Sequence, residues 1–169
     1  MKSAYLLFSY LLLISLTVAC IPRVESTERD CVNDYVNLLS TAQQKSLTAE
    51  IIELEETIGS QIAIMIIDTL NGEKIEDYSF KKANEWALGR KGYNDGILIT
   101  MSMKDRKMRI EVGKGLEKII KDEIAAKIIR EDMVPDFKKD KNYEGLMSAV
   151  IKIKGLIKEN KDLVGQKPD

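Results

Sequence analysis

Gln61-Ile62-Ala63-Ile64-Met65-Ile66-Ile67 is the stretch that decides the fold class. Six of these seven residues are apolar and four are isoleucine, a composition typical of a strand that is buried on both faces. Such a strand belongs to a sheet that helices cover above and below. This stretch therefore predicts an α/β protein.

A helical pattern precedes this strand and another follows it. Ser40 and Gln43 have the spacing of a capping box, and Gly59 is a typical helix stop just before the strand. Between them, apolar residues recur at helical spacing: Leu47, Ile51, Leu54 and Ile58. After the strand, a second helix is expected over 75–88, ending at Gly89.

The rest of the chain completes a three-layer arrangement. The further elements expected are a strand over 97–103, a polar turn over 104–107, an alternating strand over 108–112, and helices over 121–133 (stopping before Pro135) and 143–159. Residues 32–39 fit either a short strand or an extended lead-in. This order predicts an α/β/α sandwich with a small mixed sheet, in which strands 61–67 and 97–103 are parallel and 108–112 is antiparallel.

Composition closes several classes of chemistry. The 169 residues contain no histidine and only two cysteines, which excludes Ser-His-Asp and Cys-His catalysis, imidazole zinc sites and a four-cysteine zinc site. Lysine and arginine total 26 against 27 acidic residues. The chain therefore lacks the basic excess that would indicate a nucleic-acid partner. Any site must use carboxylates, amides, hydroxyls, lysine and arginine.

The amino terminus has the pattern of an export signal. Lys2 precedes an apolar run that is too short to span a bilayer and ends in small residues before Cys20. The segment 16–20 resembles a bacterial lipobox, in which Cys20 is lipidated. Ordinary signal cleavage, with Cys20 pairing with Cys31, and a short uncleaved anchor are the alternatives. All three predict a domain outside the cytoplasm, in the cell envelope.

These observations divide the chain into four parts. The predicted parts are a signal peptide over 1–19, a lipid-anchored tether over 20–31, one α/β domain over 32–160 and a flexible tail over 161–169.

The predicted topology sorts the polar loops into two ends. Asn94, Asp95, Glu117 and Asp122 are expected to be neighbours at the end where strand 97–103 begins. Asp68, Asp105 and Arg106 belong to the opposite end. Oxygen ligands of the first group suit Ca²⁺ or Mg²⁺, and the glycines at 92, 96, 113 and 115 would admit backbone atoms to an ion. The alternative is an ordinary Asn-Asp-Gly turn with acidic residues that favour a helix start.

An ordered series of segments carries a family resemblance over residues 32–153. The segments are Val32-Asn33-Asp34-Tyr35, Leu38-Leu39-Ser40, Gly59-Ser60-Gln61-Ile62-Ala63, Trp86-Ala87-Leu88-Gly89-Arg90-Lys91, Asn94-Asp95-Gly96-Ile97-Leu98-Ile99, Asp105 to Glu117, Pro135-Asp136-Phe137 and Tyr143-Glu144-Gly145. Together they resemble the TPM domain family, whose bacterial members are often labelled phosphatase-like.

The resemblance implies an α/β/α sandwich in an extracytoplasmic, membrane-associated setting, with acidic loop residues that hold divalent cations. Asp34 and Asp95 match recurring acidic positions of the family, and Glu117 and Asp122 are weaker matches. Lys114 stands where an aromatic residue is usual, and Asn94-Asp95 where Asp-Asn is frequent. Cys20 would replace the family's usual carboxyl-terminal membrane helix as the anchor.

Two functions are therefore expected. The first is an accessory module, tethered to a membrane, that binds a divalent cation and a membrane protein complex. This interpretation is preferred because no nucleophile or general base is identifiable. The alternative is a metal-dependent phosphatase, in which Asp34 and Asp95 hold Ca²⁺ or Mg²⁺ and Arg90 or Lys114 faces the phosphate.

Overall fold

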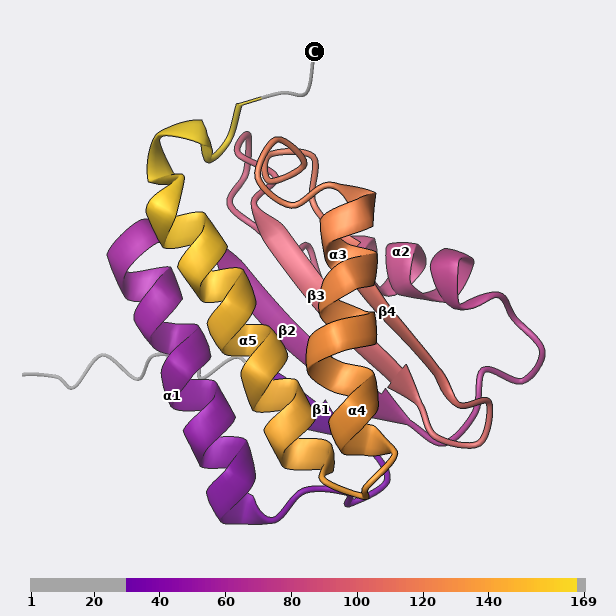
Figure 1. The fold of residues 1–169 in the computed structure, drawn as a ribbon. Coiled ribbons are helices and arrows are strands. Elements are labelled where there is room, and N and C mark those ends of the chain that lie inside the picture. Colours follow the sequence, from indigo (N-terminus) through magenta and orange to yellow (C-terminus); the bar gives the residue numbers. More distant parts are fainter. Residues whose placement is uncertain (1–29, 167–169) are drawn as a thin grey trace, which may run out of the picture.

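The computed structural model describes residues 30–166 (Figure 1). Its elements are β1 (Val32–Asp34), α1 (Thr41–Ile58), β2 (Gln61–Ile67), α2 (Ile75–Glu85), β3 (Gly96–Ser102), β4 (Lys107–Val112), α3 (Asp122–Ile128), η1 (Ile129–Met133), α4 (Val134–Phe137), α5 (Asn142–Glu159) and η2 (Lys161–Leu163). The predicted signal peptide and most of the tether, with Cys20, lie outside the described residues. No helix within 30–166 is both long and apolar enough to cross a membrane.

The four strands form one mixed sheet in the order β1-β2-β3-β4. β1 and β3 are both parallel to β2, and β4 is antiparallel to β3. The register pairs Gln61 with Gly96 at the start of β2 and β3, and Ile67 with Ser102 at their end. We call these the amino end and the carboxyl end of the sheet.

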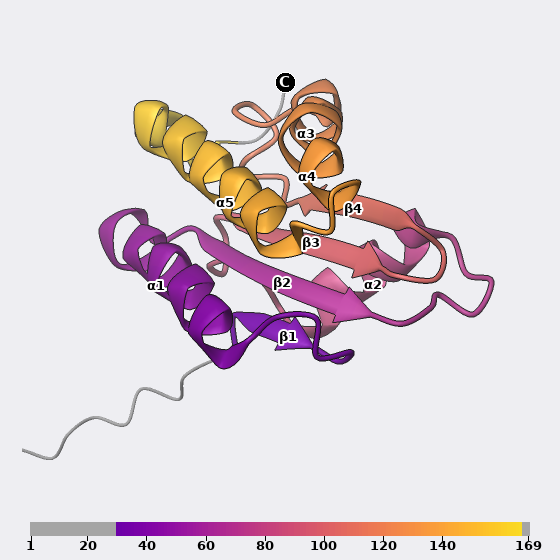
Figure 2. The same cartoon turned by 60° about the horizontal axis from the view of Figure 1, so that its bottom comes forward.

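Helices cover both faces of the sheet, as predicted (Figure 2). Isoleucines 62, 64 and 66 of β2 point to the core shared with α1 and α5, whereas Ala63, Met65 and Ile67 point to a smaller core under α2. The capping box at Ser40 and Gln43 is confirmed, and it starts α1 where the sequence places it.

The crossovers β1-α1-β2 and β2-α2-β3 step in the same direction across the sheet, while their helices lie on opposite faces. The two crossovers therefore have opposite hands, and one of them is left-handed, which is rare. A consequence is that the loops after β1 and β2 leave toward opposite faces of the sheet.

The predicted helix boundary at Pro135 is wrong. The helix expected to stop before Pro135 continues through it, because a π-helical turn over Ile129–Met133 places Pro135 in the first turn of α4, where its missing N–H is not needed. Part of the predicted tail, residues 161–166, lies within the described residues. A 3-10 turn follows α5, and the Gly165 N–H donates to the Gly115 carbonyl at 2.9 Å.

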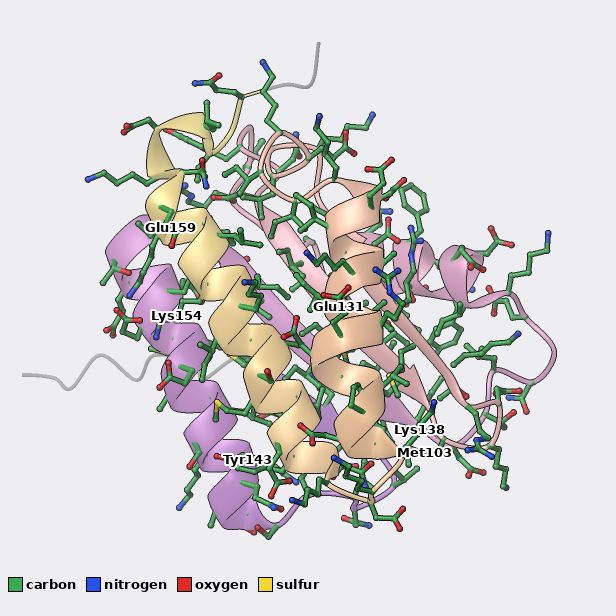
Figure 3. All side chains as sticks on the ribbon, in the orientation of Figure 1. Met103, Glu131, Lys138, Tyr143, Lys154 and Glu159 are labelled. Atoms are coloured by element: carbon green, nitrogen blue, oxygen red, sulfur yellow. The ribbon has the colours of Figure 1, made fainter. Side chains whose placement is uncertain are left out.

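Lysines of α5 join that helix to two acidic residues of α1. Lys154 is labelled in Figure 3. Its Nζ lies 2.5 Å from Glu50 Oε2 and also pairs with Glu53, and the Lys158 Nζ donates to Glu53 Oε1 at 2.6 Å. Hydrogen bonds from Lys154 and then Lys158 hold the pKa of Glu53 below its ordinary value of 4.5.

This arrangement predicts a pH-dependent loss of stability. A carboxylate with a lowered pKa in the folded chain stabilises it above the unfolded pKa, and the contribution is lost as pH falls through the folded pKa. We expect Lys154→Met to lower the free energy of unfolding at pH 7 and to have a smaller effect below pH 4.5. Urea unfolding at pH 7 and pH 3 measures this, with exposed Lys152→Met as the control. Equal effects at both pH values would assign the role of Lys154 to packing of its methylenes.

Candidate functional site

The loops at the amino end pack closely against one another. The Gly113 N–H donates to the Gly96 carbonyl at 2.8 Å, and the Gly115 N–H donates to the Asn94 carbonyl at 3.0 Å. These bonds confirm that the turn at Asn94 and Asp95 lies beside the loop that leads to Glu117.

The glycines serve this packing. A Cβ at Gly115 would overlap the Tyr93 carbonyl oxygen, and a Cβ at Gly113 would overlap the Asn94 carbonyl oxygen. We predicted that these glycines let backbone atoms approach an ion. In the structure they instead let the backbone of a neighbouring loop approach.

Asp95 is fully buried at this end, and both its oxygens have partners from the chain itself. Oδ1 accepts from the Arg90 backbone N–H at 2.7 Å, and Oδ2 accepts from Arg90 Nε at 2.8 Å and Nη2 at 2.6 Å. The Ser60 hydroxyl lies 3.4 Å from the same Oδ2. Charge-assisted bonds of this geometry are strong. Asp95 thus orders the loop 90–95 and has no oxygen turned toward an outside ligand.

Arg90, predicted to bind an anion, is committed to this pair. Its guanidinium also lies over the Tyr93 ring, 4.2 Å from the centroid. Lys114, the second residue predicted to bind an anion, is exposed on the loop between Gly113 and Gly115. Of the two residues predicted to bind an anion, Arg90 is therefore paired within the chain, whereas Lys114 is exposed to solvent.

Asp34 lies at the carboxyl end, away from Asp95. It pairs with Ile66 of β2, whereas Asp95 immediately precedes Gly96, the partner of Gln61. Asp95 is thus level with Ser60, six residues before Ile66, so the two positions are about 20 Å apart along the strands. Asp34 accepts from the N–H groups of Val36 and Leu39, which ordinarily stabilises a turn. The prediction that Asp34 and Asp95 hold one ion is wrong, because the strand register separates them.

Asn94, Glu117 and Asp122 remain as oxygen ligands at the amino end. Asn94 has a positive φ of 51° in the turn, Glu117 is half-buried, and Asp122 is exposed in the first turn of α3. Within residues 30–166, no three acidic or thiol side chains gather closely enough to form a metal cluster.

Acidic residues at the carboxyl end are also paired within the chain. Asp68 binds Lys104 at 2.6 Å, and both side chains are exposed. Asp105 accepts from the Ser102 hydroxyl at 2.5 Å and from the Leu70 N–H at 2.7 Å. The hydrogen bond from Ser102, and then that from Leu70, hold the pKa of Asp105 below its ordinary value of 3.8. These contacts join the loops that follow β2 and β3.

Two cavities flank β1, the outer strand of the sheet. The sequence did not predict either cavity. A cavity of about 340 Å³ opens beside Asn33 on the α2 side, and one of about 460 Å³ opens beside Val32 on the α1 side. The first is lined by Ala63, Trp86 and Leu88, the second by Thr48 and Ile52. Side chains alternate between the two faces of a strand, so the sequence could have indicated that Val32 and Asn33 point to opposite faces of the sheet. It could not have indicated that a cavity lies on each face.

The fold and these contacts define a small α/β/α sandwich domain with a hydrogen-bonded amino end and, among residues 30–166, β1 as the outer strand of the sheet. The family model of the TPM domain matches residues 32–156, and the chain belongs to this family. A search among proteins of curated function found no match.

Solved structures share the fold. The N-terminal domain of a protein from P. gingivalis has a TM-score of 0.74 and 25% identity, covering 81% of this chain and 87% of that one. The BA42 protein of the psychrophilic bacterium Bizionia argentinensis has a TM-score of 0.65 and 17% identity, covering 75% and 86%. An N-terminal domain from Corynebacterium glutamicum has a TM-score of 0.60 and 11% identity, covering 83% and 84%.

Proposed function

We propose that the chain is a membrane-tethered, extracytoplasmic accessory module that binds a partner protein, belonging to a membrane complex, through the outer edge of β1. The observation that supports this most is the position of β1. It is the end strand of the sheet (Figure 2). A cavity opens on each of its faces.

The backbone of β1 is suited to an added strand. The Cys31 carbonyl accepts from the Ile64 N–H, and the Tyr35 N–H donates to the Ile66 carbonyl. Backbone groups alternate in direction along a strand, so those of Val32 and Asp34 point away from β2. An extended segment of the partner would bond to these groups, and its alternate side chains would enter the two cavities.

The place of this edge relative to the chain's beginning supports the same function. Asp30 lines both cavities and lies near the end of the predicted tether over 20–31. The segment from Cys20 to Asp30 spans at most about 35 Å when extended. Lipidation at Cys20 would hold the edge within that distance of the membrane, where a membrane protein could reach it.

The divalent cation is the second part of the proposal. Asp95 is occupied by Arg90, so a Ca²⁺ or Mg²⁺ ion at the amino end would use oxygens of Asn94, Glu117 and Asp122. So few ligands favour weak binding of the kind found in extracellular modules, with Kd of about 0.1–1 mM. The acidic pair that the phosphatase alternative was expected to use, Asp34 and Asp95, is split between the two ends of the sheet.

Photo-crosslinking in intact cells tests the partner surface. A photoreactive amino acid replaces exposed Tyr35, beside the edge, or exposed Ile151 of α5 as the control. We expect one discrete adduct from position 35, little from 151, and loss of the adduct when Val32→Pro removes an outward N–H. Circular dichroism checks that this variant is folded, since proline is tolerated on an outer strand. Equal adducts from both positions, or an adduct that survives Val32→Pro in a folded chain, would contradict the proposal.

Titration with CaCl₂, followed by NMR, tests the ion. We expect the amide resonances near residues 94 and 117 to shift as CaCl₂ is added. The double variant Glu117→Gln, Asp122→Asn should lower the apparent affinity for Ca²⁺ at least fivefold. The matched control replaces Asp68 and Glu73, two acidic residues near the carboxyl end, by their amides. Shifts that are unaffected by the first pair would contradict an ion at the amino end.

A further inference from the structure

A third cavity, of about 400 Å³, lies at the carboxyl end between the β3-β4 turn and the helices α4 and α5. Its apolar lining consists of Met101, Met103, Met108, Val134 and Phe137. Its polar lining consists of Ser102, Arg106, Lys107, Lys138, Asp140 and Asn142. Figure 3 shows Lys138, at the end of α4, beside Met103. These segments are distant in sequence, and no motif connects them.

The charge of this lining is positive. Arg106, Lys107 and Lys138 are exposed at the cavity and form no ion pair within residues 30–166. Asp140 is the only acidic residue among the lining side chains. The nearby Asp105 carboxylate, outside the lining, accepts hydrogen bonds from Ser102 and Leu70 and also interacts electrostatically with Lys107. The lining therefore contains three cationic residues and one acidic residue.

The apolar part of the lining suits a flexible hydrocarbon or ring. Methionine is unbranched and polarizable, so three methionines can adapt to different apolar shapes. Phe137 is half-buried on the helical side of the cavity. Burying apolar surface is favourable, and small-molecule sites commonly combine such a lining with a few charged groups.

We propose that this cavity binds an organic anion that carries an apolar chain or ring, such as a fatty acid or an aryl phosphate. The anionic group would lie among Arg106, Lys107 and Lys138, and the apolar group against the methionines and Phe137. The cavity lies at the end of β3, beside its turn into β4. The site is separate from the outer edge of β1.

Four probes separate charge from apolar contact. Octanoate and phenyl phosphate carry both features and distinguish an aliphatic from an aryl ligand, while acetate has only the charge and octanol mainly the apolar chain. Binding to the full mature chain is followed by amide NMR at about 0.15 M salt. We expect octanoate or phenyl phosphate to shift amides in 102–108 and 134–142, with affinity at least tenfold above both acetate and octanol.

Two lysine variants provide the matched comparison. Lys138→Met should weaken binding about tenfold, the usual effect of losing a charge-assisted contact. Lys139→Met removes the same charge one residue away, outside the lining, and should change binding less than twofold. Equal weakening by both variants would mean non-specific attraction and would overturn the proposal. Absence of shifts with both octanoate and phenyl phosphate would overturn it as well.

Discussion

Asp95→Asn is expected to lower the free energy of unfolding by about 2–3 kcal/mol. The carboxylate is fully buried and accepts from Arg90 through the backbone N–H and two guanidinium nitrogens. Removing one member of a buried ion pair ordinarily costs about 3–5 kcal/mol. The Arg90 side chain is 37% exposed and can turn to water, which reduces the cost.

Urea unfolding measures this loss, and Asp68→Asn is the control. Asp68 also pairs with a cation, but its side chain is 53% exposed and that of Lys104 is 71% exposed. Exposed pairs contribute about 0–1 kcal/mol, so the control should unfold close to the wild type. The deficit of Asp95→Asn should be the same with and without CaCl₂. A deficit that appears only in CaCl₂ would mean that Asp95 is an ion ligand and that its bonding to Arg90 is not its main role.

The buried strand and the helix start could be predicted because each depends on neighbouring residues alone. The apolar residues of 61–67 are themselves the reason why that strand is buried, and the hydrogen bonds between Ser40 and Gln43 are themselves what starts α1. Pro135 shows the limit of such local rules. The rule that a helix ends before proline assumes α-helical register, and the π-helical turn before Pro135 changes that register.

The candidate site was predictable in position but not in chemistry. Topology correctly placed Asn94 and Asp95 beside the loop 113–117. It could not show that Arg90 turns back onto Asp95, because that depends on the path of the loop between them. Asp34 was assigned to the site through the family resemblance, and the register of β1 against β2 places it at the other end. The cavities beside β1 and beside Lys138 depend on packing between segments far apart in sequence.

Gly115→Ala is expected to lower the free energy of unfolding by about 3 kcal/mol or more, a larger loss than that of Asp95→Asn. The added Cβ would overlap the Tyr93 carbonyl oxygen, and the Cα of Gly165 lies 3.1 Å away on another side. Backbone atoms on both sides cannot move without breaking the bonds from Gly115 to Asn94 and from Gly165 to Gly115. Overpacking ordinarily costs about 1–3 kcal/mol, and here it also separates three loops.

Gly155→Ala gives the matched control of opposite sign. Gly155 lies in α5, and a Cβ there meets no atom within 4 Å. Alanine is favoured over glycine in a helix by about 0.5–1 kcal/mol, so this variant should be more stable than the wild type. Thermal and urea unfolding measure both variants. Because Gly115 and Asp95 act on the same packed loops, Gly115→Ala combined with Asp95→Asn should lose less than the sum of the two single losses. Full additivity would show that the packing of loop 113–117 and the Arg90-Asp95 pair stabilise the amino end independently.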